Sequence, residues 1–337
     1  MKILVTGAAG FIGAATVKAM LEQGHEVVGL DNINSYYDTG LKYARLADVG
    51  VSQSSIRENV LVESVQTAAY RFVMMNLTDR IRMDRLFASE KFDVVINMAG
   101  QAGVRYSIEN PFAYVESNVL GFLNLLENCS HYPVRHLIYA SSSSVYGMGK
   151  HIPYAETDVT DCPVSLYAAT KKSDELMAYS YSHLYGIPAT GVRFFTVYGP
   201  WGRPDMAPFL FMNAILKGEP VRVFNHGNMQ RAFTYIDDVV GALMCLTEHP
   251  SADSVPHRVY NIGCSTPVAL LDFIRTIERV TGRKALIQME NMQKGDVRCT
   301  YADTTLLEHD FGYRASTSID EGLQKFYDWY RMFVLNK

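Results

Sequence analysis

A glycine-rich segment near the start of the chain constrains its fold more than any other feature. Residues 5–13 read Val-Thr-Gly-Ala-Ala-Gly-Phe-Ile-Gly, after a strand pattern over Lys2–Thr6 and at the start of a helical pattern over Gly10–Gln23. Such a turn lets a diphosphate approach the backbone at a helix N-terminus, where N–H groups and the helix dipole favour anions. A plain strand–helix turn is the simpler alternative. We predict that a dinucleotide diphosphate lies against Gly7, Gly10, Phe11, Ile12 and Gly13.

A carboxylate follows the second predicted strand. Asp31 comes directly after the run Glu26–Leu30. It lies about 20 residues beyond the turn, where an acidic residue accepts hydrogen bonds from the adenosine ribose. Its charge would repel a 2′-phosphate, and the neighbouring Asn32 brings no compensating cation. The pattern therefore favours NAD over NADP as the cofactor.

Short apolar runs alternate with helical patterns along the first part of the chain, which predicts a parallel sheet with helices on both faces. Beyond residue 197 the alternation loosens, and prolines mark loops. Further strands are expected over Arg71–Met75, Phe92–Met98, Val134–Ala140 and Pro188–Phe194, and helices over Asp79–Ser89, Pro111–Cys129 and Ser165–Tyr185.

The fold class that follows is α/β. We predict a Rossmann-type, doubly wound parallel sheet over residues 1–196 and a smaller C-terminal α/β substrate lobe over residues 197–337. Some segments of the lobe are expected to return to the main sheet. Helices over Asp237–Glu248 and Ile319–Phe333 are expected in the lobe, and the polar stretch Val49–Gln66 is expected to be a surface insertion.

Composition argues against several kinds of partner. The formal net charge of −4 gives no support for binding to nucleic acid or to an anionic membrane. Five scattered cysteines without metal-ligand spacing predict free thiols and no metal site. The first strand pattern begins at residue 2, which leaves no room for a signal peptide. No apolar run approaches the roughly 18 residues of a membrane helix, so we expect a cytoplasmic protein.

A tyrosine and a lysine lie one turn apart on the helix predicted over Ser165–Tyr185. Tyr167 and Lys171 therefore share a helix face. A free tyrosine, with a pKa of about 10, is a poor base, but an ammonium and an oxidised nicotinamide both stabilise a phenolate. A Tyr–Lys pair at this spacing is common by chance, so its position in the chain must support a catalytic role. The run Ser141–Ser144 directly follows a predicted strand, and ligands bind beyond the carboxyl ends of parallel strands. A solvated loop is the alternative for the serine run.

These motifs occur in the order typical of the extended short-chain dehydrogenase/reductases that act on nucleotide sugars. The chain resembles them over nearly its whole length, through the GxxGxxG spacing, Asn97-Met98-Ala99-Gly100-Gln101, Asn118, Ser-Ser-Val-Tyr-Gly and Tyr-x-x-x-Lys. The resemblance implies that Tyr167 takes a proton from a sugar hydroxyl, Lys171 bonds the nicotinamide ribose, and Ser142 holds the same sugar oxygen. It also implies NAD contacts from Asn76, Leu77, Gln101 and Asn118, although an acidic residue is common where this chain has Asn76-Leu77.

Three segments distinguish among the branches of that superfamily. Sugar-nucleotide 4,6-dehydratases carry an Asp-Glu pair where this chain has Ser143-Ser144, and UDP-glucuronate decarboxylases place a glutamate at the second position. The segments RFFTVYGPWGRPDMA (193–207) and QAGVRYS (101–107) resemble the UDP-glucuronate 4-epimerases. That family has Thr196 where UDP-galactose epimerases have asparagine.

The resemblance implies a set of hydroxyl groups around the uronate carboxylate. Oxidation at carbon 4 makes a β-keto acid, which loses CO2 readily when the breaking bond aligns with the carbonyl π system. Hydroxyl donors that hold the carboxylate out of that alignment would protect the intermediate. A loop salt bridge is the alternative for Arg203. The residues assigned to the sugar are Arg105, Ser142, Ser143, Ser144, Thr196 and Arg203.

The resemblance assigns the UDP moiety to the C-terminal lobe. Arg231 matches an arginine on the phosphates, for which a planar guanidinium is suited, although Ala232 stands where aspartate is usual. An apolar strand core is the equal alternative for the two residues assigned to uracil. The remaining assignments are Asp296 and Arg298 to the UDP ribose, and Val223 and Phe224 to uracil.

The expected activity is reversible interconversion of UDP-glucuronate and UDP-galacturonate through a 4-keto intermediate, with NAD tightly bound, as a step toward a surface polysaccharide. Alternatives are 4-epimerisation of a neutral or N-acetylated UDP-hexose, UDP-glucuronate decarboxylation, a simple reductase, and a non-enzymatic NAD-binding sensor or scaffold. The resemblance also implies a homodimer formed through helices such as Pro111–Cys129 and Ser165–Tyr185.

Overall fold

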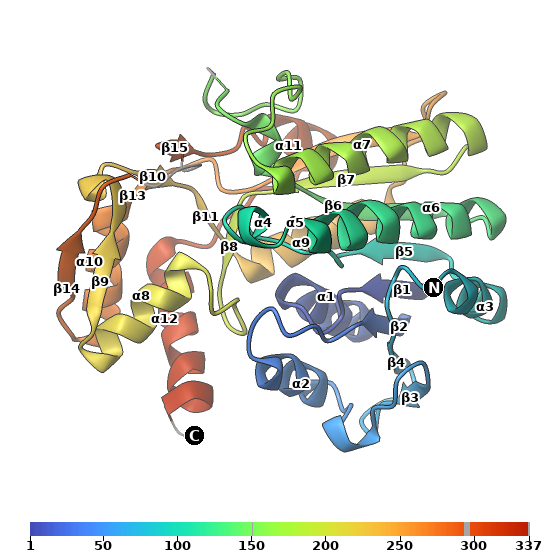
Figure 1. The fold of residues 1–337 in the computed structure, drawn as a ribbon, viewed down its shortest axis with the longest axis horizontal. Coiled ribbons are helices and arrows are strands. Elements are labelled where there is room, and N and C mark those ends of the chain that lie inside the picture. Colours follow the sequence, from blue (N-terminus) through green and yellow to red (C-terminus); the bar gives the residue numbers. More distant parts are fainter. Residues whose placement is uncertain (150, 293–296, 336–337) are drawn as a thin grey trace. The chain divides into compact units, whose positions relative to one another are not determined.

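The computed structural model describes residues 1–149, 151–292 and 297–335 (Figure 1). These residues form two compact units, each made of three chain segments. Unit 1 comprises Met1–Gly147, Val159–Arg193 and Val240–Tyr260, and unit 2 comprises Met148–Asp158, Phe194–Val239 and Asn261–Lys337. The units are therefore discontinuous in sequence.

Unit 1 is built on an eight-stranded sheet in the order β12-β7-β6-β5-β1-β2-β4-β3. β1 pairs in parallel with both β2 and β5, so the strand order reverses at β1, the position where doubly wound sheets bind ligands. This topology confirms the predicted Rossmann-type fold. The strands are β1 (Lys2–Thr6), β2 (Glu26–Asp31), β3 (Leu61–Glu63), β4 (Tyr70–Met74), β5 (Val94–Asn97), β6 (His136–Ser142), β7 (Ala189–Phe194) and β12 (His257–Ile262).

Helices cover the sheet and bury its apolar strands. Side chains such as Leu4, Phe87, Phe122 and Leu137 form one buried cluster, because strands covered on both faces carry near-continuous apolar runs. Figure 1 shows α6 and α7 lying along the sheet, and these two helices contact each other. The helices are α1 (Phe11–Glu22), α2 (Thr39–Asp48), α3 (Arg80–Glu90), α4 (Tyr106–Glu109), α5 (Pro111–Tyr114), α6 (Gly121–His131), α7 (Leu166–Tyr185) and α9 (Ile236–Glu248), with 3₁₀ turns at Gln53–Ser55 and Ser143–Tyr146.

Two elements of unit 1 differ from the sequence expectation. The helix predicted over Pro111–Cys129 extends to His131, and its middle, Val115–Leu120, is a π-helix. The stretch expected to be a surface insertion contributes β3, which pairs antiparallel with β4 at the sheet edge. β3 has only three residues, and their side chains are half-buried or exposed, so its sequence lacks the apolar pattern that identified the other strands.

Unit 2 consists of short strand pairs and four helices among its described residues. Its core is aromatic: the Phe233 and Phe273 rings stack with centroids 4.0 Å apart, and Phe326 stacks on Trp329. The pairs are β8 (Thr196–Tyr198) with β11 (Phe233–Tyr235), β9 (Pro220–Val223) with β14 (Leu286–Met289), and β10 (Gln230–Arg231) with β13 (Val268–Ala269) and β15 (Cys299–Thr300). The helices are α8 (Ala207–Lys217), α10 (Leu270–Thr281), α11 (Thr305–Phe311) and α12 (Ile319–Tyr330), with a 3₁₀ turn at Phe224–Gly227 and a π segment at Arg331–Leu335.

Among the described residues, no helix is both long and apolar enough to cross a membrane. Within the same residues, no three metal-ligating side chains are grouped as a cation site requires.

Candidate active site

The glycine-rich turn between β1 and α1 leaves no space for side chains at Gly7 and Gly13. Gly7 has a φ of 68°, and a Cβ there would lie 2.7 Å from the backbone of Met98 and Ala99 at the end of β5. A Cβ on Gly13 would lie 2.1 Å from the Gly7 carbonyl oxygen. Gly10 is the N-cap of α1 and makes no side-chain cap. The turn thus leaves bare backbone and a helix N-terminus toward a diphosphate, so these residues fit NAD.

Asp31 ties the second strand to this turn. It is buried, and its two carboxylate oxygens accept hydrogen bonds from Ala9 N at 3.1 Å and Ile33 N at 2.8 Å. Each oxygen keeps a second lone pair for a ribose hydroxyl. The exposed Asn32 side chain accepts from Asn34 N, so it turns back on its own loop.

Two buried cations beside the turn were missed in the sequence. Arg45 donates to Ala9 O at 2.9 Å and to the Tyr37 hydroxyl at 2.7 Å. Lys42 donates to Asn34 O, and its ammonium lies 5.1 Å from the Tyr37 ring centroid. Their spacing of three residues on α2 is the signal that could have found them, because it places both on one helix face.

Asn118 joins the loop after β5 to the catalytic helix. Its side-chain oxygen accepts from Gln101 N at 2.7 Å, and its amide donates to Gln101 O and to Thr170 Oγ1, both at 3.0 Å. Asn118 lies in the π segment, and such local widening of a helix is frequent at functional sites. The structure thereby brings the predicted cofactor residues Gln101 and Asn118 beside α7.

The other predicted adenine residues lie at the end of β4. Asn76 is exposed, and its side-chain oxygen accepts from Thr78 N at 3.2 Å. The Leu77 side chain is buried, and its carbonyl oxygen accepts from the Asn124 amide. Since β4 pairs in parallel with β2, and Met74 lies opposite Asp31, these residues follow at the same edge of the sheet as Asp31.

The predicted catalytic residues lie on β6 and α7, which pack against each other. Ser142 is the last residue of β6, and its hydroxyl accepts from Ser144 N at 3.2 Å and Ser144 Oγ at 2.9 Å. Tyr167 lies in the first turn of α7, with its ring edge-to-face with Tyr114. The buried Lys171 donates to Ala140 O on β6 at 2.9 Å, which fixes α7 against the strand that ends at Ser142.

A buried ion pair supports the serine run. Arg193 on β7 binds both oxygens of Glu175 at 2.8 Å, and Ser141 Oγ donates to the same carboxylate at 2.7 Å. Although burial alone would raise it, the hydrogen bonds from Arg193 hold the pKa of Glu175 below its ordinary value. Arg193 also donates to the Tyr146 hydroxyl, so one guanidinium anchors both ends of the segment that contains Ser142. Sequence reasoning missed this pair, because its members are 18 residues apart.

The predicted UDP residues of unit 2 divide into two groups. Arg231 and Arg298 lie side by side, because β10 runs parallel to β15 and the Arg231 guanidinium donates to the backbone carbonyls of Val297 and Arg298. These carbonyls support Arg231 where Ala232 supplies no carboxylate. Asp296 lies outside the described residues. Val223 is fully buried on β9, in agreement with the strand-core alternative, whereas Phe224 has the Arg222 guanidinium 5.2 Å from its ring centroid.

The sugar residues assigned outside the serine run lie on separate elements. Thr196 begins β8 and is half-buried. Arg203 forms an ion pair with Asp205, with Nε 3.0 Å from Oδ1, which agrees with the loop salt bridge kept as its alternative. Arg105 is exposed at the start of α4.

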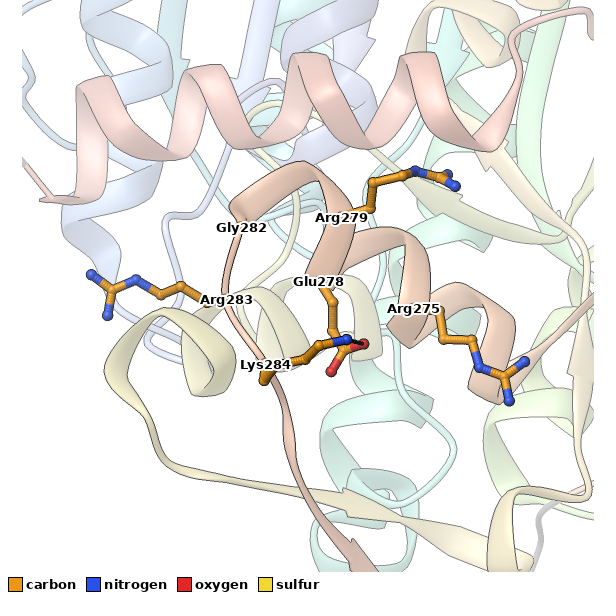
Figure 2. Close-up of a pocket in the computed structure, with 6 residues that line it drawn as sticks. All are labelled: Arg275, Glu278, Arg279, Gly282, Arg283 and Lys284. Carbon is orange, nitrogen blue, oxygen red and sulfur yellow. Dashed lines mark hydrogen bonds and ion pairs between the residues drawn. The ribbon is translucent and has the colours of Figure 1, made fainter.

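A surface hollow at the end of α10 involves none of these residues. Figure 2 shows its lining, in which Arg283 points away from Arg275 and Arg279. Arg275 pairs with Asp272, Arg279 with Asp320, and Lys284 with Glu278. Three of the cations have carboxylate partners and Arg283, which points away from them, donates to the Leu216 carbonyl, so the hollow is not a converging anion site.

A sheet that reverses at β1, a bare glycine turn beyond it, and a Tyr–Lys pair beside a serine run define a dinucleotide-dependent Rossmann enzyme. The model of the NAD-dependent epimerase/dehydratase family matches residues 3–263. The chain belongs to this family, and NAD is its cofactor.

Individual relatives agree with this assignment. The chain is 44% identical over 345 residues to a probable UDP-glucuronate 4-epimerase of Rhizobium meliloti, with 98% of this chain and 97% of the relative covered. It is 46% identical over 344 residues to protein CapI of Staphylococcus aureus, with 98% of each covered. The structure matches UDP-glucuronic acid 4-epimerase from Bacillus cereus in complex with UDP-glucuronic acid and NAD, with a TM-score of 0.88, 31% identity, and 98% and 99% of the two chains covered.

Proposed function

We propose that the protein is a UDP-glucuronate 4-epimerase, which interconverts UDP-glucuronate and UDP-galacturonate. The observation that carries the proposal is the row of hydroxyls Ser142–Ser144 beside Tyr167 and Lys171, with no carboxylate in the row. A 4,6-dehydratase needs an acid there to expel a hydroxyl from carbon 6. The Rhizobium meliloti relative and the Bacillus cereus structure, both bearing the name of this activity, support the choice.

The chain's own residues then perform the proton chemistry. Tyr167 takes the proton of the hydroxyl on carbon 4, and Ser142 holds that oxygen through a hydrogen bond. Lys171 places a positive charge near the phenolate that forms, and it contacts the nicotinamide ribose. NAD⁺, when bound, would supply the redox chemistry at carbon 4, because a nicotinamide can accept a hydride and donate it back. Tyr167 finally gives the proton back, so the cycle is redox-neutral and consumes no co-reactant.

Hydroxyl groups at the other end of the sugar protect the keto intermediate. In the proposal, Ser143, Ser144 and Thr196 donate hydrogen bonds to the carboxylate and keep its bond to the ring out of line with the carbonyl π system. Arg203 and Arg105 complete the set of substrate residues. Arg231 and Arg298, which are neighbours in unit 2, hold the UDP phosphates and ribose together with Asp296.

The test is to incubate the purified protein with single UDP-sugars and identify the products by ¹H NMR. UDP-glucuronate and UDP-galacturonate should each convert to the same mixture, without net NADH. Formation of UDP-xylose with CO2 would identify a decarboxylase, and conversion of neutral or N-acetylated UDP-hexoses alone would identify the other epimerase class. Accumulation of NADH would indicate a dehydrogenase, and NAD binding without turnover of any sugar would indicate a sensor or scaffold.

We further infer a homodimer. Apolar side chains are exposed on two adjacent helical segments: Phe112 on α5 is 83% exposed, and Leu176 on α7 is 58% exposed. Val115 and Leu120 on the π segment and Tyr179 on α7 are exposed as well. Exposed apolar surface of this kind marks protein–protein contact. The five free cysteine thiols support a reducing, cytoplasmic location for the enzyme.

A further inference from the structure

Asp174 is a buried carboxylate in contact with the catalytic lysine. Its Oδ2 lies 3.1 Å from Lys171 Nζ, and the two residues are 1% and 4% exposed. Its other oxygen, Oδ1, is buried and has no hydrogen-bond partner among the described residues. A carboxylate that is half satisfied in a buried position is costly to the fold. Such a group is a candidate for a functional role.

Tyr167, Lys171 and Asp174 form one row along α7. They are separated by four and then three residues, so they share a helix face, and seven residues of helix span about 10 Å. Lys171 thus lies between Tyr167 and Asp174 along that row. A negative charge on Asp174 offsets the positive charge that Lys171 presents to Tyr167.

Other charged groups around Asp174 are already paired. Glu175 faces it from the same helix and is bound by Arg193 on β7. Tyr139 faces it from β6 and is hydrogen-bonded to His257, and burial, with Glu175 and Asp174, raises its pKa. The other titratable groups on the elements packed against α7 are His136 on β6, Tyr106 and Glu109 on α4, Tyr114 on α5, Glu116 on the π segment, Glu127, Cys129 and His131 on α6, and Tyr146 on the 3₁₀ turn.

The net charge of Lys171 and Asp174 depends on whether the Asp174 carboxyl is protonated near neutral pH. Burial raises the pKa of Asp174 to about 7, with the Lys171 ammonium opposing the rise and Glu175 adding to it. Below that pH the protonated carboxyl leaves the ammonium uncompensated. Above it the ionised carboxylate compensates the ammonium.

We propose that Asp174 is a positioning residue of the epimerase, which holds the Lys171 ammonium and sets how much positive charge reaches Tyr167. This inference rests on the proposed role of Tyr167 as base. It assigns Asp174 no contact with substrate or cofactor. Asp174→Asn keeps the shape of the side chain and an oxygen that accepts from Lys171, but it removes the negative charge. In the variant, Tyr167 experiences the full ammonium charge at every pH.

The test is the ionisation of Tyr167 in the NAD-bound enzyme, followed by NMR of tyrosines labelled with ¹³C at Cζ. The signal of Tyr167 is assigned by its loss in Tyr167→Phe. At an effective dielectric constant of about 20, a charge about 10 Å away moves an ionisation midpoint by about one pH unit. We expect Asp174→Asn to lower the midpoint for Tyr167 by about that amount. The acid limb of the kcat–pH profile should move in the same direction.

Two matched variants complete the experiment. Asp174→Glu keeps the charge and should leave the midpoint near that of the wild type. Asp84→Asn removes an exposed carboxylate on α3 that accepts from the Tyr132 hydroxyl, and it should leave the midpoint unchanged. Circular dichroism verifies that each variant is folded.

An unchanged or raised midpoint in folded Asp174→Asn would overturn the proposal. The NMR signal needs no turnover, so this result is separable from failure of the proposed function. A lowered midpoint in a protein that epimerises no uronate would refute the activity and leave the charge coupling standing. Epimerisation with an unchanged midpoint would refute the coupling alone.

Discussion

Tyr167 and Ser142 show how far a single side chain depends on its surroundings. The residue type alone does not mark a catalytic site, since the chain has 21 tyrosines. Ser142 is held at the end of β6, and Lys171 is bonded to the same strand through Ala140 O. Tyr167 lies in the first turn of that helix, so the contact with β6 also fixes its position. A base must lie within reach of the proton it removes before its pKa matters.

The first prediction at this scale concerns the base itself. Tyr167→Phe should lower kcat for UDP-glucuronate by at least about 10³-fold, because no other phenol takes the proton, while NAD stays bound. Product NMR measures the turnover, and NAD released on denaturation measures the cofactor. Tyr185→Phe, at an exposed ring on the same helix, is the control and should retain wild-type rates. Comparable kcat values for the two variants would exclude Tyr167 as the base.

Arg203 and Arg231 illustrate what residue patterns leave open. The motif that contains Arg203 suggested a carboxylate ligand, and the structure gives it a carboxylate partner of its own, Asp205. Arg231 has lost the usual neighbour at Ala232, yet backbone carbonyls of a segment more than 60 residues away support it. The partner of Arg203 is two residues away in the same loop, whereas the carbonyls that support Arg231 come from a distant segment that no local pattern reports.

At the scale of elements, helix ends follow local chemistry closely. The Ser165 side chain accepts from Ala168 N at 3.1 Å as the N-cap of α7, and Gly186 ends the helix with a φ of 68°. Both signals are visible in sequence, so the predicted range Ser165–Tyr185 differs from α7 by one residue. The π segment around Asn118 has no such local signal.

The glycine turn carries a prediction for the β1–α1 unit. Gly13→Ala would place a Cβ 2.1 Å from the Gly7 carbonyl oxygen, so α1 must move away from the turn. We expect a loss of about 1–3 kcal/mol in the free energy of unfolding and a loss of NAD binding of at least about tenfold. Denaturant titration and calorimetric NAD binding to apoprotein check the two effects.

Gly24→Ala is the matched control for that variant. Gly24 follows the same helix and has a φ of 79°, with no atom within 4 Å of an added Cβ. It should cost about 1 kcal/mol in stability through backbone strain and leave NAD affinity unchanged. Equal NAD affinity in Gly13→Ala and Gly24→Ala would show that close packing at Gly13 does not shape the cofactor site.

The whole-molecule prediction concerns assembly. If α5 and α7 form the dimer contact, Phe112→Asp combined with Leu176→Asp places two charges in an apolar interface and should dissociate it. Light scattering after gel filtration should give two chain masses for the wild type and one for the variant. Ile81→Asp, at a residue 67% exposed on α3, should remain dimeric. A wild type of one chain mass, or a double variant of two, contradicts the proposed contact.

The division into units is a property of the whole chain that no local pattern reports. Residues 148–158 belong to unit 2 although unit 1 flanks them on both sides in sequence, and Val240–Tyr260 belong to unit 1. Membership depends on which strands pair, as β12 does with β7. Such pairing joins segments more than 60 residues apart, beyond the reach of any periodicity.

Interactions between residues close in sequence determine much of the fold class and cofactor preference of this protein. Glycine spacing, strand–helix alternation and the carboxylate of Asp31 are local signals, and they predicted the Rossmann class and NAD. The candidate base rested on the i,i+4 Tyr–Lys pair together with its position in the chain and the family resemblance. Tertiary packing alone decided that Arg193 braces the serine run through Glu175, that Arg45 reaches the glycine turn, and that Asp174 is buried against Lys171. Burial and long-range pairing depend on how the surrounding elements are arranged. The interaction energies of buried charges such as Asp174 and Lys171 depend on the same arrangement, because water no longer screens them.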